Sequence, residues 1–246
     1  MKPHDEKRVV ISQSMYFPWV GLLEQIRLAE IFVHYDDVQF SKGSFSNRIQ
    51  VKTQAKTRWL TIPLRDVQLG QRIDEVALDE SRDWRSQHRN ILVQAYKKAA
   101  FRDDMLSIVD QVFSQPAFSL SDVAKASVGA LVNYFNLAAH RLFVDSKNLG
   151  IHGSSSQRVL DIVKAVGGNV YITGHGAQHY LDHQFFERSG VSVQYMHYRC
   201  IPYPQLHGDF TPYVTALDLV ANCGKDGASV IQSEAVDWKR FIQDQQ

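Results

Sequence analysis

The sequence predicts an α/β fold, a mostly parallel, Rossmann-like sheet with a helical insertion around residues 84–140. Within the first 35 residues, two β-rich segments flank a helical one, as in the compact unit that joins parallel strands. From residue 142 onward, strand and helix patterns alternate, as in layered α/β proteins. Between these regions, three segments have helical periodicity and little strand character. We therefore expect a single domain, residues 1–246, with 84–140 as a helical subdomain between sheet strands.

The N-terminal unit is expected to contain a strand over residues 8–13, a helix over 21–30 and a strand over 31–35. Valine and isoleucine dominate the strand segments, and apolar residues recur at helical spacing in the segment between them. Two further strands are expected at 48–52 and 58–64. The polar stretch that separates them would allow these two strands to pair as a hairpin.

The rest of the chain is expected to begin with the inserted helices and then to alternate between strands and helices. After Cys200 it becomes loop-like and aromatic, with a helix around 214–221 and a polar C-terminal helix. The elements expected between these parts are helices at 84–99, 103–114 and 120–135, a strand at 142–145, a helix at 155–166, a strand at 169–173, a helix at 178–188 and a strand at 191–198.

Composition excludes several function classes. Of the 246 residues, 44% are hydrophobic and 22% charged, and 27 basic side chains nearly balance 26 acidic ones, so no basic stripe favours nucleic acid. The sequence contains neither the apolar region of a signal peptide nor a membrane-spanning segment. Cys200 and Cys223 are too far apart for a CxxC pair. We expect a cytoplasmic protein with free thiols, no nucleic-acid partner and no membrane insertion.

A first candidate site follows the first predicted strand and opens the first predicted helix. It contains Gln13, Tyr16, Trp19 and Gly21. In open α/β sheets, this end of a strand is where ligands usually bind, and the N–H groups of a helix start favour anions. The alternative is a tight turn in which proline fixes φ and glycine permits close packing. The sequence leaves both interpretations open.

A second candidate site begins where the second predicted strand ends. Asp36 and Asp37 are followed by Gln39, Lys42, Asn47 and Arg48, a density of polar groups that is unusual for a plain turn. A carboxylate there could hold Mg²⁺ or a ribose hydroxyl, or act as a general base, with the cations balancing anionic substrate groups. The alternative is a solvated turn with a surface salt bridge. We favour a functional role.

A third candidate site is the Gly-x-Gly loop after the strand at 169–173. Thr173, Gly174, His175 and Gly176 would expose backbone N–H groups that can cradle phosphate, with Tyr180 nearby. His179 and His183 are four residues apart, a spacing that metals use on a helix, but no third ligand accompanies them. We expect this loop to form a second wall of one pocket with the first two sites, and we expect no tightly bound transition metal.

Two weaker features remain. The run from Gly153 to Ser156 most simply caps the helix that follows it, and phosphate binding is the alternative. Cys200 lies in an aromatic segment between His197 and His207, but a nucleophilic cysteine needs a positioned base and the spacing carries no such signature.

Several motifs spread over residues 9–224 resemble one known family when they are taken together. They are Ser12-Gln13-x2-Tyr16-Phe17-Pro18-Trp19-x-Gly21, Phe32-Val33-x2-Asp36-Asp37-Val38-Gln39-Phe40, Asn47-Arg48, Trp59-Leu60-Thr61-Ile62-Pro63, Tyr171-Ile172-Thr173-Gly174-x-Gly176-Ala177, Tyr180-Leu181, Pro202-x2-Gln205, Phe210-x-Pro212 and Leu217-Asp218-Leu219-x2-Asn222-Cys223-Gly224. As a set they resemble the WbqC-like family. Thr215 stands where that family usually carries serine.

The resemblance implies a place in bacterial O-antigen or surface-polysaccharide biosynthesis, where members have been suggested to attach an amino acid such as glycine to a sugar. It supplies no catalytic residues. A looser, fold-level analogy links the first strand and turn to nucleotidylyltransferases, whose HxGH signature holds ATP phosphates. The corresponding residues 17–21 contain no histidine, so the use of ATP or Mg²⁺ stays open.

We therefore expect a transferase that joins a small acyl or aminoacyl group to an amino sugar, which is expected to be nucleotide-linked. The alternative is a non-catalytic sugar-nucleotide-binding or scaffold protein. Asp36 or Asp37 would be the base, and Lys42 would stabilise the oxyanion. The residues expected to bind substrate are Gln13, Tyr16, Trp19, Gly21, Gln39, Asn47, Arg48, Thr173, Gly174, His175, Gly176, Tyr180 and Gln205.

Overall fold

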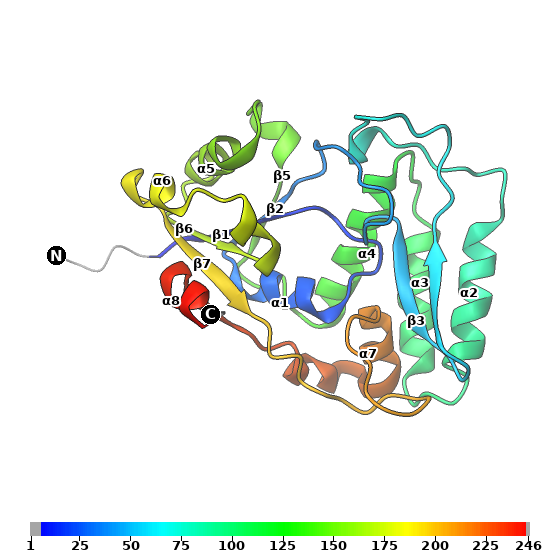
Figure 1. Cartoon of the computed structure of the whole chain (residues 1–246). Helices are drawn as coiled ribbons and strands as arrows, with labels where there is room; N and C mark the ends of the chain where they lie inside the picture. Colours follow the sequence, from blue (N-terminus) through cyan, green and yellow to red (C-terminus); the bar gives the residue numbers. More distant parts are fainter. Residues whose placement is uncertain (1–5, 245–246) are drawn as a thin grey trace.

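A six-stranded sheet organises the computed structural model, which describes residues 6–244 (Figure 1). Its strands lie in the order β5-β2-β1-β6-β7-β8, all parallel except β8, which is antiparallel to β7. Taken in chain order, these six strands follow the 3-2-1-4-5-6 arrangement of the Rossmann fold. The predicted fold class is therefore confirmed. The strands are β1 (Arg8–Ser12), β2 (Ile31–His34), β5 (Leu142–Asp145), β6 (Val170–Thr173), β7 (Ser192–His197) and β8 (Glu234–Asp237).

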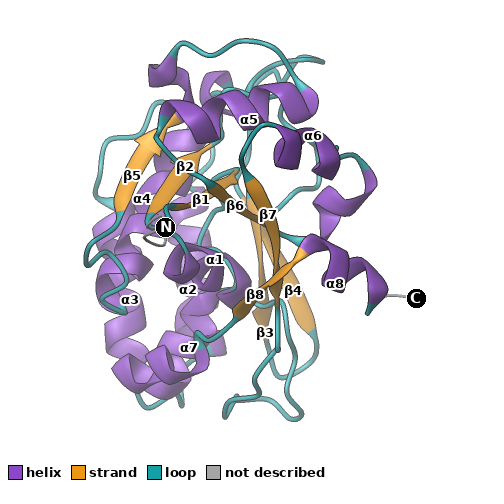
Figure 2. Cartoon of the chain, turned by 90° about the vertical axis from the view of Figure 1, so that its left-hand side faces the viewer, coloured by secondary structure: helices purple, strands orange, loops and turns teal. Residues whose placement is uncertain are grey.

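Helices cover both faces of this sheet, and Figure 2 shows α5, α6 and α8 on the side away from α1, α4 and α7. Each of these two groups of helices packs against its own face of the sheet over an apolar cluster. We call the two sides of the sheet the α5 face and the α1 face. The α-helices are α1 (Val20–Leu28), α2 (Trp84–Ala95), α3 (Arg102–Phe113), α4 (Leu120–Tyr134), α5 (Ser155–Ala165), α6 (His183–Arg188), α7 (Ala216–Cys223) and α8 (Trp238–Gln243).

The strand side chains alternate between these two faces, because successive residues of a strand point to opposite sides. Val9 and Ile11 belong to the apolar cluster under α5, whereas Val10 belongs to the cluster under α1. Both faces of the sheet are thus buried, which explains why the strand segments read as continuous apolar runs rather than alternating ones. All three side chains have at most 9% of their area exposed.

The helices predicted within residues 84–140 form as α2, α3 and α4, between β2 and β5 in the chain. A separate hairpin of β3 (Arg48–Lys52) and β4 (Thr57–Thr61) precedes them, as expected. Ser119 caps α4 through a capping box with Asp122. Apolar residues of α2, α3 and α4 share one cluster with the α1 face of the sheet. The division into domain and inserted subdomain stays a prediction.

Two expected helices differ from the structure. The predicted helix 178–188 is a 3₁₀ helix, η3 (His175–His179), followed by α6, because Asp182 starts a new helix by accepting a hydrogen bond of 2.9 Å from the Phe185 N–H. The predicted C-terminal helix is preceded by the 3₁₀ helix η4 (Gly224–Val230) and by β8. Four residues carry too little pattern to predict a strand, and β8 is defined by its pairing with β7.

Short 3₁₀ helices also occur at η1 (Ile73–Glu75) and η2 (Ser146–Leu149). Within residues 6–244, no helix combines the length and the apolar composition that crossing a bilayer requires.

Glu24 is a buried carboxyl group on the α1 face of the sheet. It has no exposed area, and its Oε2 accepts a hydrogen bond from the Ser233 hydroxyl. Its Oε1 is buried and accepts no hydrogen bond from the described residues. Burial raises the pKa of Glu24 from 4.5 to about 7, against the opposing effects of Ser233 and Arg27.

We predict that Glu24→Gln stabilises the protein at pH 8 but hardly changes it at pH 5. The unfolded chain releases this proton near pH 4.5 and the folded chain near pH 7, so the free energy of unfolding falls as the pH rises between these values. Glutamine avoids this loss, which should be about 3 kcal/mol at 1.4 kcal/mol per pKa unit. Urea unfolding of both proteins at the two pH values measures it; an equal gain at both would show that Glu24 does not titrate in this range.

Candidate functional site

The carboxyl ends of the five parallel strands meet at one edge of the sheet. Gln13 follows β1, Asp36 lies two residues after β2, and Gly174 follows β6, so the three predicted sites begin at the same edge. Helix α1 also borders this region, because the Gln25 amide nitrogen lies 3.0 Å from the position that a Cβ at Gly174 would occupy. The strand order reverses between β1 and β6, which is where open α/β sheets bind ligands.

Asp36 ties this edge to the α1 face of the sheet. Its carboxylate is 4% exposed and accepts hydrogen bonds from the Ser14 N–H (2.8 Å) and from the Ser121 hydroxyl of α4 (2.6 Å). Ser14 in turn shares a 2.8 Å hydrogen bond with Nδ1 of His34, and burial lowers the pKa of this histidine. Asp36 therefore positions the end of β1 against the start of α4.

Asp37 turns to the opposite side and holds α5. It forms a 2.5 Å ion pair with Arg158, and the two side chains are only 9% and 8% exposed. The Ser146 hydroxyl donates to its other oxygen. Arg158 also lies over the Tyr35 ring, 4.9 Å from its centroid. The two adjacent carboxylates thus act on different faces and do not form one acid–base pair.

The segment after Gln13 is mostly buried, and this corrects one predicted ligand contact. Tyr16 has no exposed area, shares a 3.0 Å hydrogen bond with Nδ1 of His88, and packs edge-on against Trp84. Burial lowers the pKa of His88 to about 4. Tyr16 therefore cannot stack on a substrate; it belongs to the core between the first loop and α2. Gln13 itself stays half-buried at the edge.

Trp19 and Gly21 form a packed pair at the start of α1. A Cβ at Gly21 would lie 2.1 Å from a carbon of the Trp19 ring, so the indole rests directly on this glycine. The indole also meets Tyr198 and Tyr213 edge-on, with ring centroids 4.9 Å and 5.3 Å away. Because the first turn of α1 is covered in this way, the packing interpretation of Gly21 is the one that the geometry favours.

The Gly-x-Gly segment forms the open part of the edge. Thr173 is buried and Gly174 half-buried, whereas His175, Gly176 and Tyr180 are exposed, Tyr180 by 60%. Nε2 of His175 shares a 2.9 Å hydrogen bond with the Met196 carbonyl, which fixes the turn to β7.

The histidine pair of this segment does not share a helical face. His179 ends η3 and lies beside the Gln178 amide. His183 begins α6, where it shares a 2.7 Å hydrogen bond with the Tyr195 hydroxyl. The break between the two helices separates them. Among residues 6–244, no group of three or more His, Cys, Asp or Glu side chains could hold a metal ion.

The N-terminus of α5 lies beside Tyr180 and is unusual. Ser154 occupies the N-cap position, but its side chain makes no capping hydrogen bond, contrary to the simpler expectation. Ser155 has a φ of 59°, a region that serine rarely adopts. The Ser156 hydroxyl accepts a 2.9 Å hydrogen bond from the Asp182 N–H and so links α5 to the turn before α6. Strained, exposed backbone of this kind concentrates at ligand sites.

The second half of the Asp36–Arg48 motif lies away from the edge. Gln39, Lys42 and Asn47 line a cavity of about 740 Å³ between residues 39–42 and 61–69. Arg48 points elsewhere: its guanidinium donates to the Gly43 carbonyl and stacks on Trp59, 4.1 Å from the ring centroid. Arg48 forms no salt bridge with Asp36 or Asp37; the cation that pairs with Asp37 is Arg158 of α5.

Gln205 and Cys200 lie in the segment between β7 and α7. The Gln205 amide oxygen accepts from the Thr211 N–H (2.8 Å) and from the buried Lys52 ammonium (3.2 Å), so Gln205 fastens the loop before α7. Cys200 is a partly buried free thiol, with a φ of 51°.

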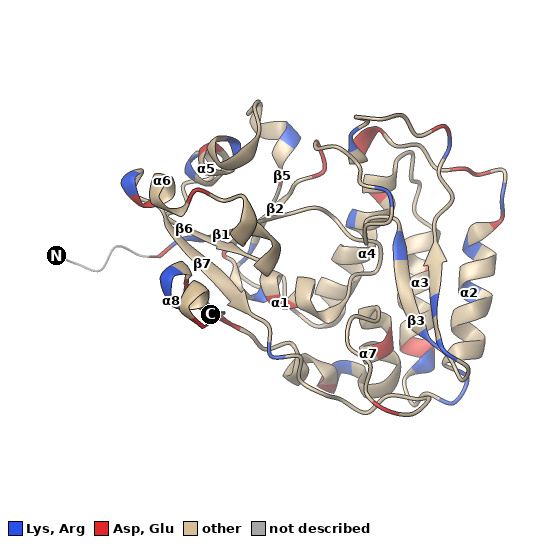
Figure 3. Cartoon of the chain, in the orientation of Figure 1, with Lys and Arg blue, Asp and Glu red and all other residues tan. Residues whose placement is uncertain are grey.

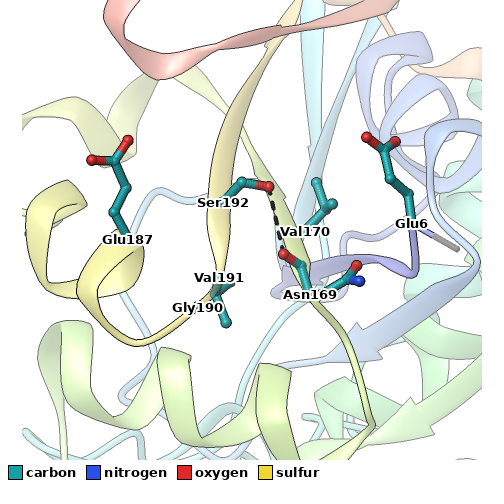
Figure 4. A pocket seen from close by; sticks show the side chains of 7 residues that line it. All are labelled: Glu6, Asn169, Val170, Glu187, Gly190, Val191 and Ser192. Carbon is teal, nitrogen blue, oxygen red and sulfur yellow. Dashed lines mark hydrogen bonds between the residues drawn. The ribbon is translucent and has the colours of Figure 1, made fainter. Parts of the chain in front are cut away.

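Another pocket lies at the opposite, amino-terminal edge of the sheet (Figure 4). It is lined by Glu6 and Glu187 among small side chains, and its Ser192 hydroxyl points to the Asn169 carbonyl. Glu187 is already engaged by Lys239 and Trp238. The pocket shares no residue with the three predicted sites.

Across the described chain, basic and acidic positions are interspersed along the ribbon (Figure 3).

Four residues that contribute to these regions were not predicted from the sequence. Arg158 reads as an ordinary charge on an amphipathic helix, and nothing in the sequence links it to Asp37. Tyr35 reads as the last residue of a strand. Val67 and Leu69 lie in a loop that shows no motif, although two apolar residues among polar ones were a visible signal.

Comparison with known proteins gives one family and one relative. The WbqC-like protein family matches residues 13–230, which is most of the chain. A protein of Mycobacterium tuberculosis (strain ATCC 25618 / H37Rv), "Uncharacterized protein Rv1507c", is 27% identical over 238 residues, covering 96% of this chain and 98% of its own. No solved structure matches the chain significantly.

We predict that Gly21→Ala destabilises the protein by about 1–3 kcal/mol, the usual cost of overpacking, because the new methyl group would displace the Trp19 indole. Gly176→Ala is the matched control, since a Cβ there meets nothing within 4 Å. Urea unfolding measures both. If the two variants were equally stable, the indole would not be fixed over Gly21.

Proposed function

The chain belongs to the WbqC-like protein family, and from this premise we propose that it is a transferase of bacterial surface-polysaccharide (O-antigen) biosynthesis. It attaches a small acyl or aminoacyl group, such as glycyl, to the amine of a nucleotide-linked amino sugar. We also propose that the protein is cytoplasmic. The family's resemblance supplies the pathway, and the geometry of the sheet supplies the binding site.

The observation that carries the proposal is the reversal of strand order between β1 and β6. At such a point the connections leave the sheet in opposite directions, and open α/β sheets bind their ligands in the crevice that this creates outside the carboxyl ends of the strands. Gln13 and Gly174 flank this position, and α1 reaches it through Gln25. We assign the nucleotide part of the substrate to this edge.

The groups around this edge suit a nucleotide sugar. Tyr180 offers an exposed ring for stacking on a base or sugar. The start of α5, beside Tyr180, has no side-chain cap, and uncapped N–H groups favour phosphate oxygens. The exposed backbone at His175 and Gly176 adds further donors. We therefore assign the phosphates to the region between η3 and α5.

The proposed reaction is acyl transfer to nitrogen. The sugar amine attacks the acyl carbonyl carbon, a C–N bond forms, the bond from that carbon to its carrier breaks, and the amine loses a proton to a base. Asp36 and Asp37 follow the carboxyl end of β2 and remain our candidates for the base. Donors at the oxyanion would come from backbone N–H groups of the turn at Gly174.

A specific observation favours the second candidate, a non-catalytic sugar-nucleotide-binding protein. Asp36 and Asp37 are buried or nearly so, and hydrogen bonds from Ser14, Ser121 and Ser146 and an ion pair with Arg158 engage their oxygens. A base must reach the proton that it removes. The binding site at the edge is common to both candidates, so binding and transfer are tested separately.

For binding, we predict that Tyr180→Ala weakens the affinity for UDP-linked amino sugars by about 1–3 kcal/mol, the range for loss of an aromatic stacking contact to a base. Leu142→Ala is the matched control: it removes a similarly exposed side chain, 55% against 60%, at the start of β5 on the opposite edge of the sheet. Isothermal titration measures both. Unchanged affinity in Tyr180→Ala would place the nucleotide elsewhere.

For transfer, we predict that Asp37→Asn abolishes product formation but keeps nucleotide-sugar binding. The measurement is mass spectrometry of the sugar after incubation with acyl or aminoacyl donors. Asparagine leaves Arg158 without its buried anionic partner, so the free energy of unfolding should also fall by about 3–5 kcal/mol. Circular dichroism checks that the variant is folded. Transfer at the wild-type rate would remove Asp37 as the base; binding without transfer by the wild type would favour the second candidate.

A further inference from the structure

The cavity between residues 39–42 and 61–69 is a second candidate site, distinct from the edge of the sheet. Its volume, about 740 Å³, lies within the range of small-molecule pockets, roughly 300–1,000 Å³. The polar segment that begins at Asp36 leads from the edge to this cavity. We call the cavity the hairpin groove, because residues 61–64 extend β4 of the hairpin along one of its sides.

The hairpin groove has apolar walls. Phe40 and Ile62, 8% and 0% exposed, line it from the core, and the partly buried Leu64 lines it as well. Val67 and Leu69 also line it and are 40% and 97% exposed. Leu69 is the most exposed large apolar side chain in the described part of the chain. An apolar occupant would cover these side chains and remove their area from water.

Hydrogen bonds to backbone groups shape the groove. The Ile62 N–H donates to the Asn47 carbonyl at 2.8 Å, and the Asn47 side-chain amide donates to the Ile62 carbonyl at 3.2 Å. The Phe40 N–H donates to the Gln71 carbonyl at 2.8 Å. The Gln71 side chain in turn accepts the Gln68 N–H at 3.0 Å, which shapes the loop that carries Leu69. A preformed groove costs a ligand little ordering.

One cation borders these apolar walls. Lys42 is exposed, lines the groove, and forms no hydrogen bond or ion pair with any residue from 6 to 244. Its ammonium is therefore available to an anionic group at the end of an apolar ligand. The combination of an aliphatic wall and a single cation matches an amphiphile with one apolar part and one anionic part.

We propose that the hairpin groove binds the aliphatic acyl chain of a donor whose carrier is anionic, with Lys42 on the carrier. This inference rests on the proposed transferase function, and it narrows the donor from any small acyl or aminoacyl group to an aliphatic acyl group. A glycyl group would leave the apolar walls uncovered. The nucleotide sugar keeps its place at the edge, so the two substrates have separate sites.

The test uses octanoyl-coenzyme A as the probe and coenzyme A as its acyl-free counterpart, both titrated into the full chain. We expect octanoyl-coenzyme A to bind at least about tenfold more tightly, because each buried methylene group adds to affinity. Val67→Asp should weaken this binding by about tenfold or more, since a charge would enter the apolar wall. Leu142→Asp, which places the same charge at an exposed apolar position outside the groove, should not.

Lys42→Gln should weaken octanoyl-coenzyme A binding by about two- to fivefold, as for an exposed ion pair, and should reduce its dependence on salt. Lys98→Gln is the control, because Lys98 is exposed and lies after α2, outside the groove. Melting temperatures confirm that the variants fold. Equal binding of coenzyme A and its octanoyl ester, or full binding by Val67→Asp, would overturn the proposal.

Failure of this inference differs from failure of the proposed function. If UDP-linked amino sugars bind but octanoyl-coenzyme A does not, the groove proposal is wrong and the edge site stands. The converse result is that Val67→Asp weakens octanoyl-coenzyme A binding while the wild type binds no nucleotide sugar. In that case the acyl site stands, and the proposed transferase function fails because the protein does not bind the acceptor.

Discussion

Backbone hydrogen bonds along residues 14–19 join the sheet to everything inserted around it. The Phe17 N–H donates to the Ser127 hydroxyl of α4 at 2.8 Å, and its carbonyl accepts from the Thr215 hydroxyl before α7 at 2.7 Å. The Tyr16 N–H donates to the loop before the hairpin. Phe17 has a φ of 34°, a strained value that these contacts hold in place. Since an unpaired buried backbone group is costly, α4, α7 and the hairpin must dock against this segment.

This docking divides the polar motifs between two places. The segment that follows β2 starts at the edge of the sheet and continues past Lys42 to the hairpin groove, so one stretch of sequence serves both regions. The turn after β6 and the start of α5 remain at the edge. A transferase needs separate sites for donor and acceptor, and this division supplies them under the function proposed above.

The carboxylates of Asp36 and Asp37 show why adjacency in sequence is a poor guide to joint chemistry. Neighbouring residues of an extended chain point to opposite sides. Asp36 therefore reaches α4, and Asp37 reaches Arg158 of α5. Each carboxylate fastens a helix to its own face of the sheet. Their buried positions stabilise the edge on which the proposed site is built, whatever further role either of them has.

The sequence by itself determined the sheet and most of its helices, because strand and helix periods depend on local residue patterns. It also placed Gln13, Asp36 and Gly174 at one edge, since parallel strands end on the same side. Only the tertiary structure decided that Tyr16 is buried, that Arg158 pairs with Asp37 and that β8 is a strand. These outcomes depend on contacts between residues far apart in the chain, and no local pattern records which distant partner a side chain will meet.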